Sequence, residues 1–218
     1  MNALNRSAIL NQALATCPLV AILRGLPVSD APVIGQALFS AGFRVIEVPL
    51  NSPSPYRSIH LIAGQHPTAL VGAGTVLTVE DVQSVKAAGG NLIISPNFNP
   101  KVVRCAVDLG MVCMPGVMTA TEAFAALGAG AQALKIFPAE MASPAVIRAL
   151  RAVLPREAIV LPVGGITLAN MSAYCAAGAN GFGIGSALYK PNQGAETTTL
   201  NATQFIAQYD RITVTMGK

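Results

Sequence analysis

The chain has 218 residues, of which 52% are hydrophobic and only 11% charged, and its formal net charge is +4. This length suits one large α/β domain, residues 1–218, and the scarcity of polar residues predicts a homo-oligomer that buries part of its surface. The positive charges are scattered and are not interleaved with aromatic residues, so nucleic acid is not expected as a partner.

The N-terminal segment and the cysteines bear on where the protein resides. Residues 1–16 predict a short amphipathic helix without a signal-peptide core, and no apolar stretch is long enough to cross a bilayer, so no membrane association is expected. Three of the four cysteines lie in apolar surroundings, and no two have the close spacing of a metal-binding or redox pair: Cys17, Cys105, Cys113 and Cys175. These features predict free thiols and a cytoplasmic location.

Short apolar runs recur along the chain, each followed by a polar or Gly/Pro break and then a helical pattern. Eight runs of this kind are found: Leu19 to Leu23, Val45 to Leu50, Leu70 to Val76, Leu92 to Pro96, Met111 to Val117, Ala133 to Pro138, Ile159 to Gly164 and Gly181 to Ser186. Eight parallel βα units with doubly buried strands predict a (β/α)8 TIM barrel with an N-terminal helix. An open doubly wound sheet is the alternative, but the first run lacks a dinucleotide-binding glycine fingerprint after it.

Four helix starts are predicted from capping residues. Thr78 with Asp81, and Thr119 with Glu122, have the spacing of a capping box. The pair Ser29-Asp30 and the pair Ser143-Pro144 also have the composition of a helix N-terminus.

A lysine lies inside the sixth apolar run, at Lys135 in Ala133-Leu134-Lys135-Ile136-Phe137-Pro138. With an ordinary pKa of about 10.4, only about one lysine amine in a thousand is uncharged near neutral pH. Burial penalises the ammonium form, so a lysine in apolar surroundings becomes a nucleophile that can attack a carbonyl. The alternative is a lysine that extends from a strand end into solvent.

The active site of such a barrel lies at the carboxyl ends of its strands, where several polar residues occur. Arg24 ends the first run, Glu47 lies late in the second, and Thr75 ends the third. Strands two and six stand opposite one another in an eight-stranded ring. Because side chains alternate with a period of two, Glu47 and Lys135 are predicted to meet at the centre of the barrel if both point inward.

Glu47 has two interpretations, an ion pair that neutralises Lys135 or a group that transfers protons. An ionised Glu47 raises the pKa of Lys135, whereas desolvation and a nearby Arg24 lower it, and catalysis requires the second pair of effects to dominate. Arg24 could lie at the surface, but its position beside the second strand favours binding of a carboxylate by its planar guanidinium.

Two pairs of small residues, Gly164-Gly165 and Gly185-Ser186, follow the seventh and eighth runs. Backbone amides at these positions form a phosphate site in many barrels, and Ser186 is predicted to open a short helix. Tight turns explain each glycine taken alone, whereas both pairs together favour a phosphate site.

No metal site or cofactor is predicted. His60 and His66 lack the spacing of a metal-binding histidine pair, and we predict surface positions for both. No cluster of Asp, His or Cys has the pattern of a metal site.

Six blocks of the chain together resemble the family of 2-keto-3-deoxy-6-phosphogluconate and -phosphogalactonate aldolases. The blocks extend from the first run to about Tyr189 and are Ala21 to Gly25, Val45 to Pro53, Gly72 to Leu77, Leu134 to Ala139, Val163 to Gly165 and Gly183 to Ser186. The resemblance implies that Lys135 forms a Schiff base, that Glu47 moves protons, that no metal is used and that the protein is a homotrimer.

The activity implied by the resemblance is cleavage of a phosphorylated keto acid to pyruvate and glyceraldehyde 3-phosphate. Arg24 and Thr75 would then hold the pyruvate carboxylate, and Ser186 with the glycine amides would hold the phosphate. Pro96 and Phe137 would shape the pocket wall.

The resemblance also bears on which C4 epimer is cleaved. Family members acting on the gluconate epimer usually have an arginine shortly after the glutamate and a threonine before the paired glycines. This chain has Asn51-Ser52-Pro53 and Val163 instead, with its arginine at Arg24. The pattern resembles the galactonate branch and implies a role in galactonate catabolism, with cleavage of the gluconate epimer as the alternative.

Two other functions remain open. A phosphosugar isomerase or epimerase on the same fold would share the phosphate site and a catalytic glutamate, but it would not need a covalent lysine. A phosphosugar sensor would bind its ligand without consuming it, and it gains nothing from an amine whose burial is costly.

Overall fold

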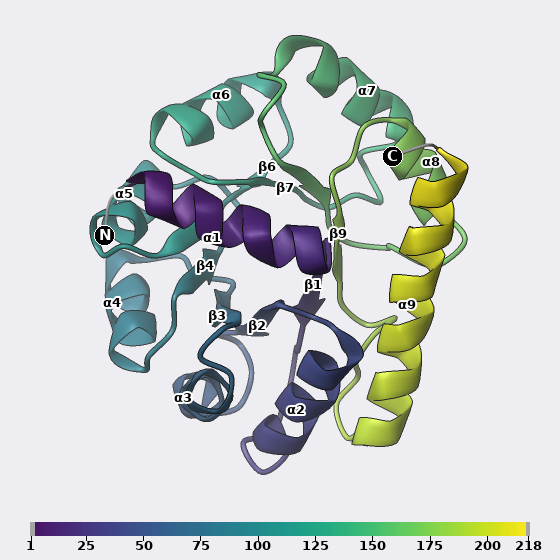
Figure 1. Ribbon diagram of the computed structural model, residues 1–218. Coiled ribbons are helices and arrows are strands. Elements are labelled where there is room, and N and C mark those ends of the chain that lie inside the picture. The colour runs from purple at the N-terminus through teal and green to yellow at the C-terminus, as the bar shows by residue number, and fades with distance from the viewer. Residues whose placement is uncertain (1–2, 217–218) are drawn as a thin grey trace.

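The structure is a computed structural model that describes residues 3–216, in which strands and helices alternate around a central barrel (Figure 1). The strands are β1 (Leu19–Ile22), β2 (Val45–Pro49), β3 (Leu70–Gly74), β4 (Leu92–Ile94), β5 (Val112–Met114), β6 (Gly116–Val117), β7 (Leu134–Ile136), β8 (Val160–Pro162) and β9 (Phe182–Ile184). The helices are α1 (Ala3–Thr16), α2 (Ala31–Ala41), α3 (Pro55–Gln65), α4 (Val79–Ala87), α5 (Pro100–Asp108), α6 (Ala120–Gly128), α7 (Pro144–Val153), α8 (Met171–Ala176) and α9 (Ala195–Thr215). Of the predicted N-terminal helix, residues 1 and 2 lie outside the described residues.

All the strand pairs are parallel, and they fall into two sheets with the orders β5-β4-β3-β2-β1-β9 and β6-β7-β8. A parallel bridge between Val163 and Gly183 joins β8 to β9. The other junction is covalent, because β5 and β6 are the two halves of the predicted fifth strand, separated by Pro115. The predicted (β/α)8 barrel is therefore confirmed, and the sixth, seventh and eighth predicted strands are β7, β8 and β9.

Side chains inside the barrel form an apolar cluster separate from the cluster between the strands and the outer helices. The inner cluster includes Val45 and Leu161, and Leu10 and Ala13 of α1 pack against it. Helix α1 leads directly into β1 and lies across the amino-terminal end of the barrel (Figure 1). Because α1 closes that end, the carboxyl ends of the strands form the open end.

Two of the predicted helix caps form and two do not. Thr78 and Thr119 each make a complete capping box, as predicted. Asp30 and Ser143 also occupy N-cap positions, but neither side chain makes a capping hydrogen bond. Both of these helices have proline in the first turn, which fixes the backbone for a helix without a side-chain cap.

The predicted surface position of His66 is wrong, because this residue is only 4% exposed. Its ring stacks on Phe39 of α2, with ring centroids 4.5 Å apart. The guanidinium of Arg44 lies 4.1 Å from the centroid of the same Phe39 ring. His60 is exposed on α3, as predicted.

The four cysteines form no disulfide bond within residues 3–216, and three of them are buried as predicted: Cys17, Cys113 and Cys175. Burial raises the pKa of Cys113 to about 12, so this thiol stays protonated. Among the helices of residues 3–216, none combines the length and the apolar character needed to cross a membrane.

Candidate active site

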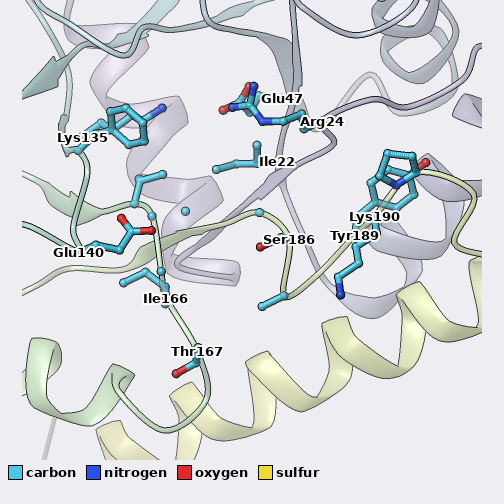
Figure 2. A pocket seen from close by; sticks show the side chains of 18 residues that line it. Ile22, Arg24, Glu47, Lys135, Glu140, Ile166, Thr167, Ser186, Tyr189 and Lys190 are labelled. Atoms are coloured by element: carbon cyan, nitrogen blue, oxygen red, sulfur yellow. The ribbon is translucent and has the colours of Figure 1, made fainter.

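A pocket with a volume of about 360 Å³ opens at the carboxyl ends of the strands (Figure 2). Its walls come from β1, β2, β7 and β9 and from the segments that follow β1, β7, β8 and β9. The lining residues that sequence analysis selected are Arg24, Glu47, Lys135, Phe137, Val163, Gly164, Gly165, Gly185 and Ser186. The strand ends therefore bring together most of the predicted site.

Lys135 of β7 and Glu47 of β2 enter this pocket from different strands of the barrel, as the period of two predicted. Lys135 is 7% exposed and Glu47 is 1% exposed. A small apolar space beneath both residues is lined by Ile94, Met114 and Leu161 among others. The amine and the carboxyl group therefore face each other above an apolar floor.

Burial shifts the pKa of each group toward neutrality. Desolvation lowers the pKa of Lys135, Glu47 opposes this shift, and Arg24 adds to it. Desolvation raises the pKa of Glu47 to about 7, against the opposing effects of Lys135 and then Arg24. The competition posed by the sequence is thus decided in favour of desolvation, which brings the pKa values of the amine and the carboxyl group closer together.

Gly74 of β3 makes room for the Glu47 carboxyl group. A Cβ atom at Gly74 would overlap Glu47 Oε2 and its carboxyl carbon. Glu47 Oε2 is buried without a hydrogen-bond partner among the described residues. Sequence analysis missed this contact, although glycine within a buried strand signals close approach by another group.

Phe137 stands two residues beyond Lys135 and lies in the pocket wall. The Lys135 Nζ atom is 4.7 Å from the centroid of the Phe137 ring. This ring face stabilises an ammonium or iminium cation at Nζ, and its apolar surface contributes to the desolvation of the amine.

Arg24 follows β1 and is anchored by the segment that follows β2. Its Nη1 donates a hydrogen bond of 3.0 Å to Asn51 Oδ1, and the backbone amide of Gly25 donates one of 2.9 Å to Ser52 Oγ. Asn51 thus holds the Arg24 guanidinium, and Ser52 holds the backbone of the residue that follows it.

The loop after β8 carries Gly164 and Gly165 in the left-handed region, with φ values of 104° and 63°. Asn170 supports the loop, because its Nδ2 donates to Gly165 O at 2.8 Å and its Oδ1 accepts from the Thr167 amide at 2.9 Å. A side chain at either glycine would run into Glu140. The glycine pair is thus explained in part by packing within the pocket wall.

The predicted short helix at Ser186 is wrong. Residues 186–188 form a turn in which the amides of Leu188 and Tyr189 both donate to Gly185 O, at 2.8 and 3.0 Å. The next helix, α9, begins only at Ala195. Pro191 and Gly194 lie between this turn and α9, and they prevent a continuous helix.

Two predicted residues do not line this pocket, and several lining residues were missed, Glu140, Tyr189 and Lys190 among them. Thr75 follows β3 with a φ of 58°, and neither it nor Pro96 belongs to the pocket wall. Glu140, Tyr189 and Lys190 do line the pocket. They lie in connecting segments, where no strand periodicity indicates which way a side chain points. Within residues 3–216, no group of three or more His, Cys, Asp or Glu residues is placed to hold a metal ion.

Comparison with known proteins agrees with this arrangement. Residues 10–202 match the family model described as KDPG and KHG aldolase. The chain belongs to the KDPG and KHG aldolase family.

Two curated relatives in the aldolase family are similar over most of their length. A protein of Escherichia coli (strain K12), the 2-dehydro-3-deoxy-6-phosphogalactonate aldolase, is 47% identical over 88% of this chain and 94% of its own. A protein of Rhizobium meliloti (strain 1021), the probable 2-dehydro-3-deoxy-6-phosphogalactonate aldolase, is 47% identical over 89% of this chain and 92% of its own. A solved structure described as native KDPGal has a TM-score of 0.88 at 45% identity and covers 90% of this chain and 96% of its own.

Proposed function

We propose that this protein is a class I aldolase that cleaves 2-dehydro-3-deoxy-6-phosphogalactonate to pyruvate and glyceraldehyde 3-phosphate, in galactonate catabolism. The observation that carries the chemistry is the burial of Lys135 and Glu47 in one pocket, with both pKa values shifted toward neutrality. The two relatives at 47% identity, which are named for this activity, support the substrate.

Neutral Lys135 attacks the C2 ketone of the substrate and forms a carbinolamine. Glu47 supplies and removes the protons that are transferred at this stage. Loss of water leaves an iminium ion. Glu47 then accepts the proton of the C4 hydroxyl while the C3–C4 bond breaks, and the electron pair moves into the iminium to give an enamine and the free aldehyde. Glu47 returns a proton to C3, and hydrolysis releases pyruvate and regenerates the Lys135 amine.

The remaining residues of the site bind the two ends of the substrate. Arg24 at the pocket wall holds the carboxylate, for which a fixed guanidinium is suited. Ser186, with the backbone amides of Gly185 and Ser186, holds the phosphate. Phe137 shapes the wall around the reacting carbons.

The chemistry is tested by incubating the protein with pyruvate and borohydride and measuring its intact mass. We expect one reduced pyruvyl adduct, which peptide mapping places on Lys135. Absence of an adduct from folded protein that binds pyruvate would favour an isomerase, an epimerase or a sensor instead.

The preferred epimer is tested by comparing kcat/KM for the galactonate and gluconate substrates. Val163 lines the pocket directly before the glycine pair, in place of the threonine usual in the gluconate type. We expect the galactonate epimer to be preferred by about tenfold or more, since one contact of this kind contributes about 1–3 kcal/mol. A preference for the gluconate epimer would contradict the substrate assignment.

We also propose a homotrimer located in the cytoplasm. Large apolar side chains remain exposed on the single chain, for example Val33, Met141 and Val214 at 53%, 75% and 79%. An oligomer that covers part of this surface lowers its exposure to water. Cysteines that form no disulfide bond within residues 3–216 support a reducing compartment. Native mass spectrometry is expected to give three times the chain mass of 22.4 kDa.

A further inference from the structure

The carboxyl group of Glu140 lies in the pocket wall but has no part in the proposed chemistry of Lys135 and Glu47. Glu140 follows β7, the strand that carries Lys135, and its side chain is exposed. In Figure 2 Glu140 and Lys135 lie on one side of the pocket, whereas Ser186 and Lys190 lie across from them. The wall therefore has an acceptor facing a hydroxyl and an amine.

The backbone that carries Glu140 is held at a fixed position. The Ala139 amide donates to Val163 O at 2.8 Å, and Tyr174 Oη donates to Ala139 O at 2.9 Å. On the other side, the Met141 amide donates to Pro138 O at 3.0 Å. Because the backbone amide and carbonyl groups of Ala139 both form hydrogen bonds with other elements, the backbone from which the Glu140 side chain extends is fixed in place.

Gly164 and Gly165 pack against the Glu140 carboxyl group. A Cβ atom at Gly164 would overlap Glu140 Oε2, and one at Gly165 would lie 2.6 Å from its Cγ. Any side chain at these positions would displace the carboxyl group from the wall. The two glycines thus make room for Glu140 whether or not their amides also contact the substrate.

The charge of Glu140 restricts what can bind beside it. No hydrogen bond or ion pair to its carboxylate is found within residues 3–216, so its oxygens are available as acceptors. A phosphate next to this carboxylate would be repelled, whereas a hydroxyl group would donate a charge-assisted hydrogen bond. The phosphate is therefore favoured at the Ser186 and Lys190 side, and a hydroxyl of the substrate is the group suited to Glu140.

The proposed substrate has one hydroxyl group that the other residues of the site do not use. Its C2 atom is bound to Lys135, its C4 hydroxyl is used by Glu47, and its C6 phosphate lies toward Ser186. The C5 hydroxyl lies between the reacting carbons and the phosphate. On this basis, which rests on the proposed function, we propose that Glu140 accepts a hydrogen bond from the C5 hydroxyl and is a specificity-determining residue for the aldehyde half of the substrate.

The test uses the reaction in the direction of synthesis, with pyruvate at a fixed concentration and two aldehydes. One is D-glyceraldehyde 3-phosphate, whose 2-hydroxyl becomes the C5 hydroxyl, and the other is 3-oxopropyl phosphate, which lacks that hydroxyl. We expect Glu140→Ala to lower kcat/KM for the first aldehyde by about 10- to 100-fold, the range for a hydrogen bond to a charged group. For the second aldehyde the change should stay below about threefold, since no such bond is lost.

Two further variants complete the design. Glu140→Gln keeps an acceptor oxygen without the charge and should recover part of the loss seen with alanine. Glu157→Ala removes an exposed carboxylate outside the pocket, before β8, and should behave as the unaltered protein with both aldehydes. An equal loss on both aldehydes, or a gain on both through weaker repulsion of phosphate, would overturn the proposal.

Trapping of the pyruvate adduct separates this proposal from the proposed function. If the unaltered protein forms the adduct and exchanges the methyl protons of pyruvate, the aldolase assignment stands regardless of the results for the Glu140 variants. If neither occurs, the aldolase assignment itself fails. All three variants should form the adduct as fast as the unaltered protein, because pyruvate has no C5 hydroxyl.

Discussion

The carboxyl group of Glu47 lies directly against the backbone of Gly74, on the neighbouring strand of the barrel. The register pairs Glu47 with Gly72 and Pro49 with Gly74, so Gly74 stands just beyond Glu47 toward the open end. The absence of a side chain at Gly74 lets the carboxyl group stay close to the barrel wall. A carboxyl group held there is both desolvated and directed toward the pocket.

Gly74→Ala is therefore expected to impair catalysis more than folding. The new methyl group would displace the Glu47 carboxyl group, and a misplacement of about 1 Å can lower a rate by about 100-fold. Steady-state kcat measures the loss, and circular dichroism checks that the fold is kept. Gly64→Ala is the matched control, because nothing lies within 4 Å of a Cβ at that position of α3. It should leave kcat unchanged and stabilise the helix by up to about 1 kcal/mol.

Lys135→Met is expected to abolish both the pyruvate adduct and turnover. Methionine fills the apolar site but cannot form an imine, so activity should fall by about 1,000-fold or more, comparable to the loss of other covalent nucleophiles. Intact mass after borohydride treatment and the rate of pyruvate release are the measurements. Lys101→Met, on the exposed face of α5, should retain both. Substantial turnover by the Lys135 variant would show that no Schiff base is required.

The activity should depend on pH through Glu47. With its pKa raised to about 7, Glu47 becomes the ionised base only as pH rises through neutrality. We expect kcat/KM to fall on the acidic side of about pH 7, and we expect this limb to disappear from the residual activity of Glu47→Gln. A pH-rate profile of both proteins tests this, and an unchanged acidic limb in the variant would assign it to another group.

The stability of the fold should also depend on Glu47. Because its pKa is higher in the folded chain than the ordinary value of 4.5, the folded state binds more protons between about pH 4.5 and 7. The contribution of Glu47 to stability is therefore greatest below this window and is lost as pH rises through it. Glu47→Gln should become more stable relative to the unaltered protein as pH increases from 5 to about 8, as measured by urea unfolding.

Asn51 is expected to affect catalytic activity through Arg24, whose Nη1 donates a hydrogen bond of 3.0 Å to Asn51 Oδ1. Arg24→Ala should lower kcat/KM strongly, by about 100-fold, because it removes the guanidinium proposed to bind the substrate carboxylate. Asn51→Ala should cost about three- to tenfold, since it only releases the guanidinium. In a double-mutant cycle, the pair of substitutions should cost no more than Arg24→Ala alone, whereas additive losses would mean that Asn51 acts independently.

Acid should destabilise the protein through His66. Burial lowers the pKa of His66 below its ordinary value of 6.5, and the guanidinium of Arg44 lowers it further. Below pH 6.5 the unfolded chain takes up a proton that the folded chain resists, so stability is lost as pH falls. His66→Phe keeps an aromatic ring against Phe39 and should reduce the difference in unfolding free energy between pH 5 and pH 8. His60→Phe, on the exposed face of α3, is the control.

Much of the barrel was predictable, because its elements are defined by local patterns. Buried parallel strands appear as short apolar runs, and the capping boxes at Thr78 and Thr119 have a fixed local spacing. The period of two within a strand, together with the order of strands in a closed ring, also placed Glu47 opposite Lys135. Blocks of sequence then resembled the aldolase family to which the chain belongs.

The sequence by itself thus determined the barrel, its N-terminal helix, the buried lysine and the glutamate that faces it. Only the tertiary structure decided the contacts between residues distant in the chain. These include the stacking of His66 on Phe39 and the packing of Glu140 against the loop after β8. The physical reason is that a periodic pattern fixes which face of an element is buried, whereas the direction of a side chain in a loop depends on atoms supplied by other elements.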